Sequence, residues 1–440
     1  MKKRSVLTVL AFVLSAVPAY AETLSEVIRD TLNSNPELAA QRATLRSVSA
    51  QKGQATAGYK PTIALVGDAG LEHREYEMTD IPDKIKDNAV PYSYGIQAGI
   101  NLYEGGKTMY ASKAAQFREK AEQNALRAKE VDLTAQTATA YLDYLDTVNV
   151  QTLQKNNLSV MRAHFIETRD KAKLGRGTAT DVAQAQARLE GAKALLTQAD
   201  MNVNNAVEYY FRITGKTPEY DKTLNISAIV QGAPKSKADS DVWNLIKNVP
   251  ATLQEAEKTA EENNPLLKEL TERENAAAQN VKIAKNTAYP TLDLTAYAGR
   301  QEDQIMMDYL TNYQAKLSLK VPLYDASVAH YKSAEALERK NAVRFQKDNA
   351  GAVVKQAVRS AWNEIQTRRS EINYARTQIR ANKKALDGVI DEARNGSRTT
   401  LDVLNAQQEL LDSEVTLSHA QYGLIKARIS LLQALGTLKI

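Results

Sequence analysis

One short stretch carries the residue types of a phosphate-binding loop, Gly105-Gly106-Lys107-Thr108. In such a loop the backbone N–H groups cradle phosphates and the lysine neutralises them, and the motif needs a further glycine five positions before the last one. That position is Asn101, and the strand expected before the loop is amphipathic rather than buried. The sequence therefore argues against a nucleotide site.

The side chains that could bind a metal or form a nucleophile–base pair are scattered. The four histidines are His73, His164, His330 and His419. Their spacing does not match that of metal ligands, so we expect them to be ordinary surface or seam residues. The chain has no cysteine, which excludes disulfides, thiol catalysis and cysteine-based metal sites. We therefore predict no cofactor, no metal and no enzymatic activity.

The first 21 residues have the three parts of a secretory signal peptide. Residues 1–4 form a short basic stretch and residues 6–17 an apolar run. Ala19 and Ala21 then place small side chains at the two positions that a signal peptidase reads. The apolar run is shorter than the roughly 20 residues that a helix needs to span a bilayer, which argues against an uncleaved anchor. Charges interrupt the rest of the chain. We therefore expect an exported protein that is periplasmic, secreted or an outer-membrane β-barrel, with cleavage near Ala21.

The charge balance gives no reason to expect nucleic acid as a partner. The formal net charge is +5, from 57 Lys and Arg against 52 Asp and Glu. Three of the cations lie in the signal peptide, which leaves 54 − 52 = +2 for the mature chain. This nearly neutral net charge is not the strongly basic balance that indicates a nucleic-acid partner.

The chain consists of two copies of one sequence unit. Asn35-Pro36 recurs as Asn264-Pro265, 264 − 35 = 229 residues later. Further along the chain the offset falls to 396 − 175 = 221 residues. The pairs at this second offset are Tyr103 and Tyr324, Gly175 and Gly396, Asp181 and Asp402, and Gly215 and Gly436. Several matches at one constant offset indicate a duplication.

Each copy has the same predicted order of elements. A helical segment (24–57 and 252–286) comes first, followed by two strands, a very long helix, a break marked by glycine and a return helix. The second strand of each pair alternates apolar and polar residues, over 92–102 and 313–321. This pattern suits a tilted bilayer-spanning strand, although a half-buried strand of a soluble sandwich shows it as well. We expect the charged segment 74–91 to be a solvated loop.

The predicted helices are too long for a compact domain. No proline occurs between Gly106 and Leu174, and a continuous helix of that length reaches roughly 100 Å. The return helices carry apolar residues spaced by seven. These are Val403, Leu410, Leu417, Leu424 and Leu431 in the second copy, and Val182, Leu189, Leu196, Val203 and Tyr210 in the first. A strict seven-residue repeat predicts that each return helix packs along a partner in a left-handed coiled coil.

The predicted fold class is mainly α with membrane β: long coiled-coil hairpins plus four β-strands per chain. A membrane barrel leaves no free edge in lipid and needs about eight strands or more. Two chains would supply eight strands, whose side chains fill the interior. An open pore needs more strands than eight, and three chains would supply twelve. We therefore predict a trimer, in which the helical hairpins continue the tube on the periplasmic side.

At this point the chain resembles the TolC family of outer-membrane efflux and type I secretion channels. The matching residues are the entry segment 23–38, the break 175–182, its partner 396–406, and the segment 434–438. They follow the family's order over essentially the whole mature chain. The resemblance implies a homotrimer, a 12-stranded β-barrel on an α-helical tunnel, in the outer membrane of a Gram-negative cell. It divides the chain into a signal peptide (1–21), a first repeat (22–215), an equatorial linker region (216–250) and a second repeat (251–440).

The resemblance also implies the function. We expect an exit duct that carries substrates from a tripartite drug-efflux pump or a type I secretion system across the periplasm and the outer membrane. Its implied partners are a periplasmic adaptor protein, an inner-membrane pump of the RND or ABC type, and outer-membrane lipid. The alternative is that the chain is itself a periplasmic adaptor, which also carries a coiled-coil hairpin. An adaptor has one hairpin between β-rich domains, whereas this chain has two hairpins, so the duct is favoured.

The family's gate is expected at the glycine-marked breaks, at the periplasmic tip. The gate links of the family fall on Thr180, Asp181 and Arg398, where a guanidinium beside a carboxylate or hydroxyl forms a charge-assisted bond. In one relative a tyrosine takes part in a further link, and the equivalent position in this chain is Ala393. At least one link is therefore missing or replaced. Asp181 and Asp402 also begin the return helices, where a carboxylate favours the helix dipole.

Asp402 and Asn405 match the two carboxylate rings of the family's constriction. Three copies of Asp402 around a threefold axis would repel one another, which raises their pKa values and attracts cations. The second ring is uncharged in this chain. We therefore expect a weaker block by divalent cations than two carboxylate rings would give.

The tips of the two hairpins are expected to contact the periplasmic adaptor. The residues at these tips are Gly175, Arg176, Gly177, Gly396 and Ser397. This expectation comes from the resemblance to the family.

Overall fold

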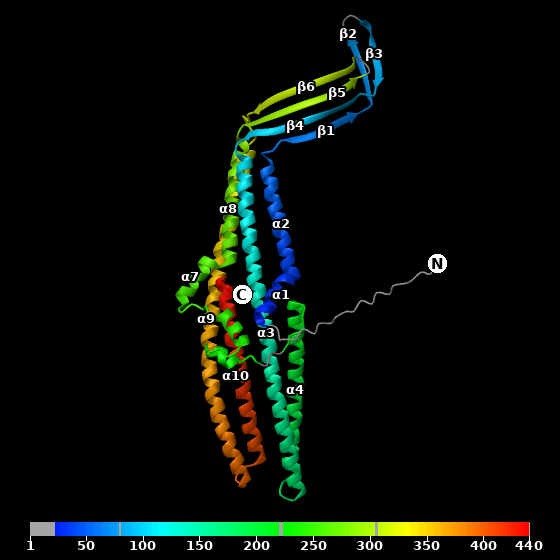
Figure 1. Ribbon diagram of the computed structural model, residues 1–440. Coiled ribbons are helices and arrows are strands. Elements are labelled where there is room, and N and C mark those ends of the chain that lie inside the picture. Colours follow the sequence, from blue (N-terminus) through cyan, green and yellow to red (C-terminus); the bar gives the residue numbers. More distant parts are fainter. Residues whose placement is uncertain (1–22, 79–80, 220–222, 304–306, 440) are drawn as a thin grey trace, which may run out of the picture.

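The computed structural model describes residues 23–78, 81–219, 223–303 and 307–439. The predicted signal peptide lies outside the described residues. The chain is elongated and mostly helical, with strands at one end and the turns of two helical hairpins at the other (Figure 1). Two helices of 67 residues each run along the molecule between these ends, α3 (Lys107–Lys173) and α9 (Val328–Arg394).

Both copies of the duplicated unit build the same main helices and strands of the four-stranded sheet. The first copy holds α1 (Leu24–Ser34), α2 (Pro36–Ala57), β1 (Thr62–Ala69), β4 (Tyr92–Glu104), α3 and α4 (Ala179–Thr214). The second holds α7 (Leu253–Asn263), α8 (Pro265–Lys285), the short 3-10 helix η1 (Asn286–Ala288), β5 (Thr291–Asp303), β6 (Met307–Lys320), α9 and α10 (Thr400–Leu435). The segment between the copies holds α5 (Ile226–Val230) and α6 (Lys237–Ile246). The predicted order of elements is therefore present.

The helical segment that opens each copy is present as predicted, and in each copy it is divided into two helices. Asn35 separates α1 from α2 and has extended backbone angles, φ −67° and ψ 125°. Asn264 separates α7 from α8 in the same way, with φ −60° and ψ 123°. A proline follows each of these residues, and its ring clashes with a helical conformation of the residue before it. The Asn-Pro pair therefore ends one helix and begins the next.

Four strands form one antiparallel sheet in the order β1-β4-β5-β6. The register places Leu65, Ile96, Ala298 and Tyr313 in one row across the sheet. This apolar face is uncovered in the single chain, with Leu65 82% and Tyr313 81% exposed. Within the described residues the outer strands, β1 and β6, each pair on one side only.

The charged segment 74–91 is not the loop that we expected. It contributes to a two-stranded hairpin of β2 (Glu72–Met78) and β3 (Ile81–Ala89), with Glu72 opposite Ala89. The sequence-based count of four strands is therefore right for the sheet but omits these two. Charged residues are depleted in strands because most strands are half-buried. The charges of segment 74–91 therefore indicate a loop, although the segment belongs to a hairpin that extends beyond the sheet (Figure 1).

The core lies midway along the helices. Leu142 of α3, Ile365 of α9 and Leu431 of α10 are almost fully buried there. The heptad residues Val403, Leu410, Leu424 and Leu431 of α10 are all buried, which confirms the predicted packing of this helix against its partners. Within the described residues, none of the helices combines the length and the apolar character that crossing a bilayer requires.

Candidate gate at the hairpin tips

The first hairpin turns at Gly175, Arg176 and Gly177. Gly175 has a left-handed backbone, with φ +70°. This conformation lets the N–H of Arg176 donate to the carbonyl oxygen of Lys171 at 2.9 Å, which closes the end of α3. A side chain at position 175 would strain this backbone, so the turn requires glycine.

The second hairpin turns in the same way at Gly396, whose φ is +80°. The N–H of Ser397 donates to the carbonyl oxygen of Glu392 at 3.0 Å, and the Ser397 hydroxyl donates to the same oxygen at 2.9 Å. The glycine-marked breaks of the sequence are therefore the tips of the two hairpins.

Each return helix begins with a capping box. In α4, Oδ2 of Asp181 accepts from the N–H of Thr178 at 3.0 Å and from its hydroxyl at 2.7 Å. In α10, Oδ2 of Asp402 accepts the same bonds from Thr399 at 3.0 and 2.8 Å. These hydrogen bonds hold the pKa of both carboxyl groups below its usual range. The expectation that both aspartates stabilise a helix start is confirmed.

Arg398 does not meet its predicted link partners within one chain. Its Nε lies 2.9 Å from the carboxylate of Glu392 on the same hairpin, and both side chains are about half exposed. Glu392 raises the pKa of Arg398, and the charge of Asp402 adds to this effect. Thr180 and Asp181 lie on the other hairpin, and in the described part of the chain neither makes a hydrogen bond or ion pair with Arg398. A link of the predicted kind would therefore have to join two chains.

Asn405 connects the two hairpins through a residue that the sequence did not point to. Nη2 of Arg188 on α4 donates to Oδ1 of Asn405 on α10 at 2.7 Å. The neighbouring Leu404 is 1% exposed and belongs to an apolar cluster with Ala185 and Leu189 of α4. Arg188 and Asn405 are 217 residues apart, and neither the repeat offset nor the heptad pattern pairs them.

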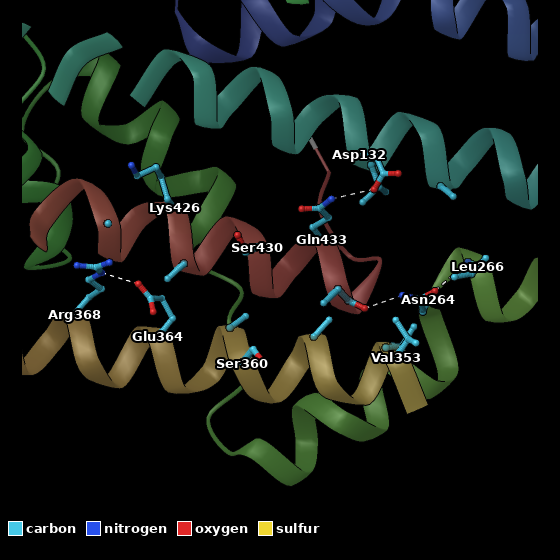
Figure 2. A pocket seen from close by; sticks show the side chains of 18 of the residues that line it. Asp132, Asn264, Leu266, Val353, Ser360, Glu364, Arg368, Lys426, Ser430 and Gln433 are labelled. Carbon is cyan, nitrogen blue, oxygen red and sulfur yellow. Dashed lines mark hydrogen bonds and ion pairs between the residues drawn. The ribbon is translucent and has the colours of Figure 1, made fainter. Parts of the chain in front are cut away.

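A cleft of about 830 Å³ lies midway along the molecule, away from the tips (Figure 2). Lys426, Ser430 and Gln433 of α10 lie on one side, and Ser360 and Glu364 of α9 lie on the other (Figure 2). None of the predicted gate residues lines this cleft. The sequence carries no signal of this cleft, because its walls come from α3, α8, α9 and α10, which only the fold brings together.

At one end of this cleft, the end of α10 meets the start of α8. Nδ2 of Asn264 donates to the carbonyl oxygen of Ala434 at 2.8 Å, and Oδ1 of Asn264 accepts from the N–H of Leu266 at 3.0 Å. Asn35 joins α4 to α2 by the equivalent bond to the carbonyl oxygen of Ile213, at 3.2 Å. In the sequence the Asn-Pro pairs are landmarks of the repeat, and only the structure shows that they are helix junctions.

A buried carboxylate fixes α10 against α3. Oδ1 of Asp146, a residue that is 6% exposed, accepts from the Ser418 hydroxyl at 2.7 Å, and its Oδ2 lies 2.8 Å from Nδ1 of His419. The hydrogen bond with Asp146 raises the pKa of His419, against the effects of burial and of the Lys426 and Arg368 charges. His419 is thus a seam residue, as predicted.

The glycines of the phosphate-loop-like stretch form the turn between β4 and α3. Gly105 and Gly106 have φ +64° and +77°, and the carbonyl oxygen of Gly105 accepts from the Asn286 side chain. The positive φ angles explain why two glycines stand here. Within the described residues no group of three or more His, Cys, Asp or Glu side chains is arranged to hold a metal ion.

Comparison with known proteins places these features in one family. The family model described as "Outer membrane efflux protein" matches residues 27–216 and 257–437. The outer membrane efflux protein BepC of Brucella suis is 28% identical over 426 residues, which cover 96% of this chain and 87% of that protein. The outer membrane protein TolC of Escherichia coli is 25% identical over 437 residues, covering 95% and 83%. The CmeC outer membrane channel of Campylobacter jejuni has the same fold, with a TM-score of 0.80 at 15% identity, over 95% of this chain and 86% of that one.

Proposed function

We propose that this chain, which belongs to the outer membrane efflux protein family, forms its channel as a homotrimer with a twelve-stranded barrel. The family consists of transport channels rather than enzymes, and the chain is an outer-membrane exit duct for efflux or secretion. The two relatives named above match over 87% and 83% of their length and are outer membrane proteins, which argues against the periplasmic adaptor.

The four-stranded sheet is the observation that carries the proposed barrel. Its apolar face, with Leu65, Ile96 and Tyr313, is uncovered in the single chain, and a patch of this kind requires lipid or protein against it. Its two outer strands also lack a partner on one side in the described residues, and lipid does not tolerate a free sheet edge.

Identical copies can satisfy both requirements. The four strands alternate in direction, so β6 of one copy and β1 of the next are antiparallel when the copies are arranged around a common axis. Three copies supply twelve strands, which is enough for an open interior, whereas eight strands fill theirs with side chains. The row of Gln97, Tyr297 and Gln314 on the opposite face of the sheet would then line the water-filled interior.

We assign the gate to the hairpin tips. Asp402 and Asn405 would form the constriction around the threefold axis, with Asp402 as its carboxylate ring. The links would join Arg398 of one chain to Thr180 and Asp181 of a neighbouring chain. In support, the Arg398–Glu392 pair is half exposed, and such a pair exchanges partners at little cost because water already screens it.

We assign the remaining segments of the chain from their order in the sequence. Residues 1–21 are removed on export, residues 22–215 and 251–440 form the two repeats, and residues 216–250 form an equatorial region. The exposed tips with Gly175 to Gly177 and with Gly396 and Ser397 contact a periplasmic adaptor. The adaptor connects the duct to an inner-membrane pump of the RND or ABC type, and outer-membrane lipid surrounds the sheet.

Fractionation and channel recording test the proposed assembly. Detergent extraction of outer membranes should release a trimer, and this trimer should form channels in a planar lipid bilayer. A chain recovered only from the soluble periplasmic fraction, or an extracted species without channel activity, would overturn the proposal.

A further inference from the structure

The contact between Arg188 and Asn405 is a polar bridge between the two hairpins near their tips. Nη2 of Arg188 and Oδ1 of Asn405 are 2.7 Å apart, and both side chains are exposed to solvent. The preceding residue of α10, Leu404, is buried against Ala185 and Leu189 of α4. An apolar contact and a hydrogen bond on consecutive residues of α10 therefore hold the start of that helix against α4.

The charge of Arg188 is not neutralised locally. In the described part of the chain no carboxylate lies within ion-pair distance of Arg188, and its polar partner is the neutral amide of Asn405. The nearest acid along α4, Glu190, pairs instead with Lys193 at 2.8 Å. A full positive charge therefore lies beside Asn405.

We infer that Arg188 is a gate residue of the duct, which latches α10 to α4 and sets the charge of the second constriction layer. This inference rests on the proposed constriction at Asp402 and Asn405. Asn405 follows Asp402 by three residues, so the two layers are about 4.5 Å apart along the helix. The first layer carries three carboxylates and the second carries three guanidinium groups.

Two layers of opposite charge have a different selectivity from two layers of carboxylates. The Asp402 layer attracts cations, while the Arg188 layer repels them and stabilises anions in transit. The duct should therefore discriminate weakly between cations and anions and should pass anionic cargo more readily. Without the charge of Arg188, the uncharged Asn405 layer would leave the constriction with the negative charge of the Asp402 layer.

The latch opposes opening, because the tip cannot widen between α4 and α10 while Arg188 holds Asn405. Loss of one exposed, charged hydrogen bond changes an equilibrium constant by about two- to fivefold. Arg188→Gln should therefore raise the open probability by about that factor for each latch, and it should also make the channel more cation-selective.

Planar bilayer recordings of variants at Arg188 and Asn405 separate the two effects. Arg188→Gln removes the latch and the charge, so open probability should rise and the reversal potential in a KCl gradient should shift toward the potassium value. Asn405→Ala removes the latch but keeps the charge, so only the open probability should rise. Arg188→Lys keeps the charge and should retain the wild-type reversal potential.

The control is Lys193→Gln, which removes a cation from the same helix, where Lys193 pairs with Glu190. Neither open probability nor reversal potential should change in this variant. The inference is overturned if Arg188→Gln behaves like Lys193→Gln while Asp402→Asn still alters the reversal potential. A wild-type protein that forms no channel would instead overturn the proposed function, so the two failures are distinguishable.

Discussion

The side-chain amide of Asn264 holds two helices end to end. Its Nδ2 donates to the carbonyl oxygen of Ala434 at the end of α10, at 2.8 Å, while its Oδ1 accepts from the N–H of Leu266 at the start of α8, at 3.0 Å. One amide thereby satisfies a carbonyl and an N–H that the two helix ends leave free. Asn35 makes the equivalent junction with Ile213 in the first copy. Pairs of shorter helices can thus lie along the single long helices α3 and α9.

Replacement of Asn264 by alanine should destabilise the protein by about 0.5–2 kcal/mol, the usual cost of losing an N-cap. Asn264→Asp keeps the acceptor of the cap but loses the donor to Ala434, so its unfolding midpoint should lie between those of Asn264→Ala and the wild type. Thermal unfolding of the purified protein measures this order. Asn363→Ala, at an exposed position of α9, is the control and should not lower the midpoint, because alanine favours a helix more than asparagine does. Identical midpoints for Asn264→Asp and the wild type would show that the donor bond contributes nothing.

Gly436 is required at the same junction for two reasons. Its φ is +71°, and a Cβ at this position would lie 2.6 Å from Cδ of Pro265. Gly436→Ala should therefore destabilise the protein by at least about 1 kcal/mol, which urea unfolding measures. Gly351→Ala is the matched control, because Gly351 lies inside α9 with no atom within 4 Å of the added Cβ. Alanine there should stabilise the helix by roughly 0.5–1 kcal/mol, so the two substitutions should have opposite signs.

The contact between His419 and Asp146 should make stability depend on pH. The hydrogen bond with Asp146 raises the pKa of His419 above its ordinary value of 6.5. A pKa that is higher in the folded state gives a stabilisation that is present in full below the unfolded pKa and lost as the pH rises through the folded pKa.

His419→Gln should therefore lower the urea midpoint more at about pH 5.5 than at about pH 8.5, on either side of the ordinary histidine pKa. His330→Gln is the control, because His330 is exposed at the start of α9, and it should lower the midpoint equally at both pH values. If the urea midpoint of His419→Gln falls further below that of the wild type as the pH rises, the raised pKa of His419 is contradicted.

The carboxylate of Asp402 should govern block of the channel by divalent cations. Asp402→Asn removes the charge and retains a polar side chain beside Thr399, so the return helix should still begin at the same place. Block by divalent cations in bilayer recordings should weaken. Glu190→Gln is the control, because it removes a carboxylate from α4 on the other hairpin, where Glu190 pairs with Lys193, outside the proposed ring and its links. Its block should equal that of the wild type.

Much of the architecture could be predicted because it is periodic. The heptads of α10 mark its buried seam, the alternation over 92–102 marks β4, and the constant offset between Gly175 and Gly396 reveals the duplication. These patterns repeat because each element buries one face along its whole length. The Asn-Pro pairs recur in both copies too, but only the structure shows that each of them divides a helical segment in two.

The contacts that join distant segments could not be predicted from one sequence. Arg188 and Asn405 are 217 residues apart, and Asp146 and His419 are 273 residues apart. Each pair depends on the rotation of two helices about their axes, which side-chain packing fixes and local propensity does not. The hairpin β2–β3 was missed for a different reason, because its charged residues lack the alternation that marks a half-buried strand.

In the proposed channel, β6 of each chain pairs with β1 of the next and three chains close the ring. The chain contains no cysteine, so introduced pairs report on this contact alone. Leu65→Cys in β1 is combined in turn with Tyr313→Cys, Ala315→Cys and Leu317→Cys in β6, which lie on the same face of the sheet.

After oxidation in isolated outer membranes, a denaturing gel without reductant should show covalent dimers and trimers and nothing larger, because a closed threefold ring has no free edge. The single variants should run as monomers or as dimers only. A ladder that ends at two chains or extends beyond three, or the absence of cross-links for every pair, would contradict the twelve-stranded trimer.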